Sequence, residues 1–92
     1  MSKGERTAMF TNKTNDGRNN ICGKTIAVRR KEMGKSQRQL ADMLQLAGLD
    51  IDKNAVQRIE AGKRFVTDIE IVTISRVLNI SYESLLDHDS EF

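Results

Sequence analysis

The chain has 92 residues and a net charge of +2; 38% of its residues are hydrophobic and 30% are charged. This length fits one small domain, which excludes a two-domain enzyme, and so small an aliphatic core suits a helical bundle better than a barrel. No apolar run approaches the roughly 18 residues that a membrane-spanning helix needs, so we expect a soluble protein with no membrane partner. The N-terminus lacks the apolar stretch of a signal peptide, which favours a cytoplasmic location.

Catalytic and metal-binding groups are scarce. The single cysteine, Cys22, cannot form an internal disulfide, and with the single histidine, His88, it cannot complete a zinc site. His88 lies between two aspartates near the C-terminus, where a solvated tail is a simpler interpretation than a metal cluster. The sequence has no glycine-rich phosphate loop and no nucleophile motif. We therefore expect no enzymatic activity, no metal and no cofactor.

The charges are distributed unevenly along the chain. Residues 1–64 contain 14 basic and 7 acidic side chains, a balance of +7, whereas residues 65–92 contain one basic and six acidic side chains, a balance of −5. A basic half can hold a polyanion while an acidic half faces away from it or meets another protein. The alternative is a chance imbalance on a solvated surface.

Residues 1–22 are predicted to form a flexible N-terminal arm, because most of them lack helical or strand periodicity and are rich in Asn, Thr, Lys and Gly. A helical pattern begins at Gly23 and ends at Met33, before Gly34, which suits a left-handed helix C-terminus. Ser36 is a suitable N-cap for a second helix that extends to about residue 47. Apolar residues recur along it at the spacing of one buried helical stripe: Leu40, Met43, Leu44 and Ala47.

Asp52 can cap a third helix, which runs from Lys53 to about residue 61 and is ended by Gly62. Residues 67–70 have the form of a capping box and open a fourth helix. Many of its residues are β-branched and favour a strand by propensity, but the cap and the length favour a helix. Ser81 starts a short fifth helix to about residue 86, and residues 88–92 form a frayed tail. The sequence thus predicts an all-α, compact five-helix domain at residues 23–87.

The third predicted helix separates into two faces at about 100° per residue. Ala55, Val56 and Ile59 fall on one side. The other side carries amides between cationic side chains, formed by Lys53, Gln57, Ala61, Asn54 and Arg58. In a DNA major groove, Arg and Lys hydrogen-bond to guanine while Asn and Gln pair with adenine, so this face suits base recognition. The alternative is the ordinary polar face of an amphipathic surface helix.

Several residues together resemble the Cro and lambda-repressor-like helix-turn-helix family, also called the XRE family. The resemblance covers residues 23–86, and it rests on the dipeptides and single residues Ser36-Gln37, Leu40-Ala41, Gly48, Val56, Ile59-Glu60 and Gly62. It implies a lambda-repressor-like DNA-binding domain in which the second helix crosses the DNA backbone and the third enters the major groove.

The resemblance also implies roles for individual residues. It places base contacts at Lys53, Asn54, Gln57 and Arg58. It places contacts to DNA phosphates at Gln37, Arg29, Lys31, Lys63 and Arg64. Arg30 and Glu60 correspond to a pair that often forms a partly buried salt bridge between the first and third helices.

The chain departs from the family pattern between the second and third helices. Leu40 and Glu60 are twenty positions apart, whereas members of this family usually have about fifteen positions between them. The five additional residues fall around residues 45–50. We expect a longer turn here, with room for an extra turn of the second helix.

These features predict a transcription regulator, in particular a repressor, that binds double-stranded DNA sequence-specifically with its third helix. One short helix reads few bases, so we expect a homodimer on an inverted-repeat operator. The alternative is a protein-binding module on the same scaffold, such as an antitoxin or an antirepressor partner, which uses the acidic C-terminal half to bind another protein.

Overall fold

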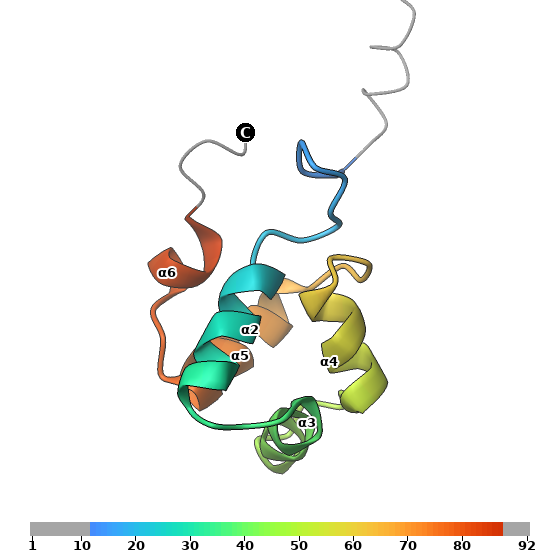
Figure 1. Ribbon diagram of the computed structural model, residues 1–92. Coiled ribbons are helices and arrows are strands. Elements are labelled where there is room, and N and C mark those ends of the chain that lie inside the picture. Colours follow the sequence, from blue (N-terminus) through green and yellow to red (C-terminus); the bar gives the residue numbers. More distant parts are fainter. Residues whose placement is uncertain (1–11, 88–92) are drawn as a thin grey trace, which may run out of the picture.

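The computed structural model describes residues 12–87, which contain five helices and no strand. Their bounds are α2 Gly23–Glu32, α3 Gln37–Leu46, α4 Lys53–Glu60, α5 Asp68–Leu78 and α6 Tyr82–Leu86. Figure 1 shows α2 and α5 in the centre, with α4 on one side of them, α6 on the other side and α3 across the bottom, where it packs against α4. The predicted all-α, five-helix architecture is confirmed, with helix ends within about one residue of expectation.

Three N-caps predicted from the sequence form in the structure. Ser36 and Thr67 each accept a hydrogen bond from the third helical backbone N–H, and in both cases a glutamine or glutamate returns the bond to complete a capping box. The Asp52 carboxylate accepts a bond from the Ala55 N–H at 2.8 Å. Each cap satisfies a backbone donor that has no partner inside its helix, which fixes where α3, α5 and α4 begin.

The β-branched segment folds as α5 despite its strand propensity. Its capping box fixes the start, and the helical spacing of Ile71, Ile74 and Leu78 places all three in the core. Tertiary burial therefore outweighs local propensity. The core of the described part is aliphatic, with one thiol, and consists of Cys22, Ile26, Leu40, Ala41, Leu44, Ile51, Val56, Ile59, Ile71, Ile74, Leu78 and Leu85.

The long connection between α3 and α4 contains no extra helical turn, contrary to expectation. α3 ends at Leu46, and Gly48 then adopts a positive φ of 96°, which favours glycine. The chain turns back so that Ile51 is 1% exposed, and the Gln45 side chain donates to the Ile51 carbonyl at 2.9 Å. The additional residues thus form a loop that is anchored in the core.

The prediction of a flexible arm is wrong for residues 12–22, the part of it that the structure describes. Residues 12–22 fold back onto the domain, because Thr14 and Asn20 are only 9% exposed and several side chains bind the end of α4. Residues 14–22 are called the strap below. The rest of the expected arm, residues 1–11, and the expected tail, residues 88–92, lie outside the described residues.

Candidate nucleic-acid interface

The two faces predicted for the third helix separate in α4 as expected. Val56 and Ile59 are 1% and 2% exposed and anchor the helix in the core. The opposite face is exposed at every position that was assigned to it: Lys53, Asn54, Gln57, Arg58 and Ala61. The longer α3–α4 loop does not cover these side chains.

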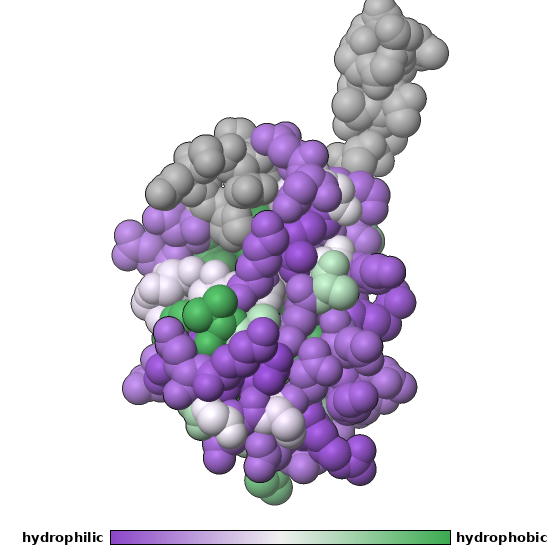
Figure 2. Space-filling model, viewed as in Figure 1, coloured by the Kyte–Doolittle hydropathy of each residue, from purple (hydrophilic) through white to green (hydrophobic). Residues whose placement is uncertain are grey.

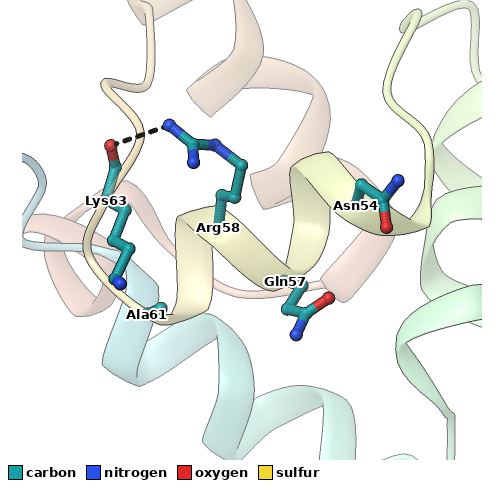
Figure 3. A pocket seen from close by; sticks show the side chains of 5 residues that line it. All are labelled: Asn54, Gln57, Arg58, Ala61 and Lys63. Carbon is teal, nitrogen blue, oxygen red and sulfur yellow. Dashed lines mark hydrogen bonds between the residues drawn. The ribbon is translucent and has the colours of Figure 1, made fainter.

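Five residues of α4 and the loop after it line an open hollow: Asn54, Gln57, Arg58, Ala61 and Lys63. In Figure 3, Asn54 and Gln57 project away from the helix, while Arg58 bends toward the following loop. The Arg58 guanidinium donates to the Lys63 carbonyl at 3.4 Å. The amides therefore lie toward the start of α4, and the cationic groups lie toward its C-terminal end.

The surface around α4 is hydrophilic. The view in Figure 2 shows mostly polar residues on the side of the molecule where α4 lies. Three cationic side chains are exposed on α4 and in the loop after it, namely Lys53, Arg58 and Lys63. An exposed polar surface that carries both amides and cations is complementary to a polyanion that has hydrogen-bonding groups between its charged edges.

The expected salt bridge between α2 and α4 forms in the structure. Arg30 Nε donates to Glu60 Oε2 at 2.7 Å and a second guanidinium nitrogen donates to Oε1 at 3.0 Å, with the side chains 10% and 7% exposed. The hydrogen bonds to Glu60 raise the pKa of Arg30 above its ordinary value. Arg30 also donates to the Lys35 carbonyl at 2.8 Å, so this pair joins α2, α4 and the start of α3.

Gln37 was expected to reach a phosphate, but its side chain is engaged inside the protein. Its Nε2 donates to Glu60 Oε1 at 2.9 Å, which makes it the third donor to the same carboxylate. Gln37 therefore completes the Arg30–Glu60 cluster and fixes the first turn of α3 against α4.

Arg64 also has an internal partner. Two of its guanidinium nitrogens donate to the two Glu70 oxygens at 3.0 Å each, and one also donates to the Phe65 carbonyl. The hydrogen bonds from Arg64 lower the pKa of Glu70, and Glu70 at the same time closes the capping box of α5. Arg64 thus ties the loop after α4 to α5, and its guanidinium is paired with the Glu70 carboxylate.

The two α2 cations assigned to phosphates lie in different surroundings. Arg29 Nε donates to the Leu78 carbonyl at 2.9 Å, at the end of α5, so the structure does not bring it to the α4 surface. Lys31 is exposed. Of the five expected phosphate contacts, the structure leaves the side chains of Lys31 and Lys63 exposed.

Sequence reasoning missed the strap, which meets α4 at its C-terminal end. Arg18 donates to the Glu60 carbonyl at 2.8 Å, and the Asn20 amide donates to the Ile59 carbonyl at 3.0 Å. The only local signal was the polar run Arg18-Asn19-Asn20 directly before the first predicted helix, and such a run is also typical of a solvated arm.

No group of three or more His, Cys, Asp or Glu side chains within residues 12–87 is placed to hold a metal ion. Burial raises the pKa of the Cys22 thiol to about 11, so it is protonated at neutral pH. None of the helices in this part of the chain is long and apolar enough to cross a membrane.

Two packed helices, the second of which presents an exposed polar face beside cations, define a helix-turn-helix protein. The helix-turn-helix family model matches residues 26–85, well over half of the chain, and the chain therefore belongs to this Cro and lambda-repressor-like family of DNA-binding regulators. A comparison with curated proteins finds no match.

Proposed function

We propose that the protein is a transcriptional repressor that reads duplex DNA sequence-specifically by inserting α4 into the major groove. The observation that carries this proposal is the exposed arc of α4, where Asn54 and Gln57 lie between cations while Val56 and Ile59 fix the opposite face. Amide and guanidinium groups on one rigid helix match the hydrogen-bonding edges of adenine and guanine. A rigid element is needed because base recognition depends on bidentate geometry.

Individual side chains take different roles in this proposal. Lys53, Asn54, Gln57 and Arg58 contact base edges, and Lys63 contacts a phosphate at the groove edge. Lys31 supplies a further phosphate contact. Gln37, Arg29 and Arg64 have internal partners and are proposed to hold the frame instead.

We further propose a symmetric dimer on an inverted-repeat operator. An α4 of eight residues reaches too few bases to select one site in a genome. Two copies about 34 Å apart would enter successive major grooves on one side of the duplex. Sedimentation with and without operator tests this arrangement, and a monomer bound to a lone half-site contradicts it.

Random-oligonucleotide selection with the purified protein tests DNA recognition directly. An enriched motif is expected, and its symmetry and half-site spacing report the arrangement of the two α4 helices. No enrichment, together with no salt-dependent retention on random duplex DNA, would favour the protein-binding module instead.

Two variants then separate the roles of the side chains. Arg58→Ala should weaken the selected site by about 5- to 150-fold while leaving random DNA nearly unchanged, because a bidentate base contact discriminates by about 1–3 kcal/mol. Lys63→Ala should weaken both DNAs alike and lower the salt slope by about one. Arg76, which is exposed on α5, provides the matched arginine control. Equal losses on both DNAs for Arg58→Ala would contradict the base-reading role.

A further inference from the structure

The strap crosses the C-terminal end of α4 and donates hydrogen bonds to five backbone carbonyls there, those of Ile59, Glu60, Gly62, Lys63 and Arg64. The Asn19 N–H donates to the Gly62 carbonyl at 2.7 Å, and the Asn19 side-chain amide donates to the Lys63 carbonyl at 3.1 Å. These two bonds hold the peptide groups before and after the Cα atom of Lys63.

Asn20 binds the same region from a more buried position. It is 9% exposed, and its Nδ2 donates to the Ile59 carbonyl at 3.0 Å and to the Arg64 carbonyl at 2.8 Å. Its Oδ1 accepts a bond from the Gly23 N–H at 2.8 Å, at the start of α2. One side chain thus joins the last turn of α4, the loop after it and α2.

Arg18 is the third strap residue that binds the end of α4. Its guanidinium donates to the Glu60 carbonyl at 2.8 Å and to the Ile59 carbonyl at 3.4 Å. It lies over Gly62, where an added Cβ would be 2.7 Å from Arg18 Cζ. Gly62 has a φ of 79°, a conformation that glycine adopts easily, so this residue alone does not fix the direction of the loop.

The strap also contains hydrogen bonds of its own and an ion pair to α2. The Thr14 N–H donates to the Arg18 carbonyl at 2.9 Å, and the Arg18 N–H donates back to Thr14 Oγ1 at 2.9 Å. The Lys24 ammonium lies 3.1 Å from Asp16, which ties the strap to α2. A segment held in this way can restrain the loop that it touches.

The strap also changes the electrostatics at the C-terminal end of α4. The last carbonyls of a helix lack partners inside the helix and carry a partial negative charge, which repels a phosphate. In the last turn of α4, the Ile59 carbonyl accepts from the Gly62 N–H as well as from the strap, and the Glu60 carbonyl accepts from Arg18 of the strap. The other strap donors bind loop carbonyls beyond the helix, those of Gly62, Lys63 and Arg64. Lys63 lies beside these carbonyls and also lines the hollow.

We infer that the strap is a positioning element of the DNA-binding surface, and that Asn19 is a positioning residue that acts through Lys63. The strap fixes the glycine-containing loop so that the Lys63 ammonium is directed to a phosphate, and its Arg18 satisfies the Glu60 carbonyl, which would otherwise oppose that phosphate. This inference rests on the proposed function, since it assigns the strap a part in the same DNA contact.

A double-mutant cycle in the full-length protein tests the inference, with binding measured to random duplex DNA at fixed salt. Asn19→Ala should weaken binding by about 2- to 10-fold, the effect of losing one hydrogen bond that orders a contact. In the Lys63→Ala background the same substitution should change affinity less than about twofold, because the contact that it positions is gone. Asn15, exposed on the strap, gives the matched control Asn15→Ala, which should have no effect.

Equal losses in both backgrounds, or no loss in either, overturn the inference. The Lys13 ammonium also binds Asn19, at 2.6 Å, but a direct contribution from Lys13 would be the same in both backgrounds and so would count against positioning. Thermal unfolding of each variant shows whether binding is measured on folded protein.

A second measurement does not depend on DNA. NMR order parameters of the Lys63 amide in the free protein should fall in Asn19→Ala and stay unchanged in Asn15→Ala. If no form of the protein binds duplex DNA, the proposed function fails, and these order parameters still decide whether the strap restrains the loop. An unchanged Lys63 amide in Asn19→Ala overturns the restraint itself.

Discussion

The two ends of α4 are held by different means. At its N-terminal end the preceding loop is anchored within its own segment: Ile51 is buried, Gln45 binds the Ile51 carbonyl, and Asp52 caps the helix. At its C-terminal end the contacts come from distant parts of the chain. Glu60 pairs with Arg30, thirty residues away, and the Glu60 carbonyl accepts from Arg18, forty-two residues away.

This difference indicates what each end contributes. The N-terminal end is held by neighbours in sequence, namely the buried Ile51 and the Asp52 cap. The end nearest Arg58 and Lys63 is held by charged and polar contacts from distant segments. The bidentate Arg30–Glu60 pair specifies the geometry of that end narrowly. The following substitutions test this contrast, from the largest expected effect to the smallest.

Glu60→Ala should have the largest effect on stability, lowering the free energy of unfolding by about 3–5 kcal/mol. The substitution leaves the Arg30 guanidinium buried without its carboxylate and removes the acceptor of Gln37. Denaturant unfolding followed by circular dichroism measures the loss. The double variant Arg30→Met with Glu60→Leu should lose clearly less, because no buried charge then remains unpaired. If the double variant is the less stable one, charge desolvation is not the dominant cost.

Ile51→Ala should lower the free energy of unfolding by about 2–5 kcal/mol, because it leaves a cavity under the α3–α4 loop. Leu46→Ala is the matched control, since Leu46 lies in the same part of the chain and is 90% exposed. Calorimetric melting temperatures of the two variants give the comparison. Equal losses would show that the loop is not anchored through the core.

Asp52→Ala should cost about 1 kcal/mol, the usual effect of losing an N-cap. The Ala55 N–H loses its acceptor, and the first turn of α4 should fray. Faster hydrogen exchange at the Ala55 amide, with Gln57 much less affected, measures this local effect. Asp50, exposed in the same loop, supplies the control substitution Asp50→Ala, which removes the same charge without removing the cap.

Glu70→Gln should have the smallest effect, about 1 kcal/mol or less at neutral pH, since exposed and half-exposed pairs contribute little. Gln can still close the capping box, so the variant isolates the Arg64 ion pair. The pKa of Glu70 is lowered from 4.5 in the folded protein. Its contribution is therefore present above about pH 4.5 and is lost as the pH falls through the folded pKa.

Unfolding curves of the wild type and Glu70→Gln should thus differ at pH 7 and converge in acid. Glu83→Gln, on the exposed side of α6, controls for the removal of one negative charge. A difference between Glu70→Gln and the wild type that stays constant down to pH 2 would exclude the ion pair as its source.

The sequence predicted the helices and most of their ends because those signals are local. Ser36, Asp52 and Thr67 each act within three or four residues of themselves, and apolar spacing identified the buried face of α4. The Arg30–Glu60 pair is a long-range contact, yet it was predicted, because the family resemblance supplied a pairing that residue spacing alone does not give.

The sequence did not predict which cationic side chains would have partners inside the protein. Arg64, Arg29 and Lys63 look alike in a linear sequence, and only the fold places Glu70 beside Arg64 and the Leu78 carbonyl beside Arg29. The contacts of the strap were not predicted for a related reason. Asn and Arg are as typical of solvated segments as of segments that cap a helix from outside, and their acceptors are backbone carbonyls, which no sequence pattern marks.

Cys22 is the last residue of the strap and the N-cap residue of α2, with 2% exposure. Because its thiol is shielded and its pKa is raised to about 11, it should react with a maleimide only when this junction opens. The maleimide labelling rate of the wild-type protein should therefore measure how often this junction opens, and no substitution is needed.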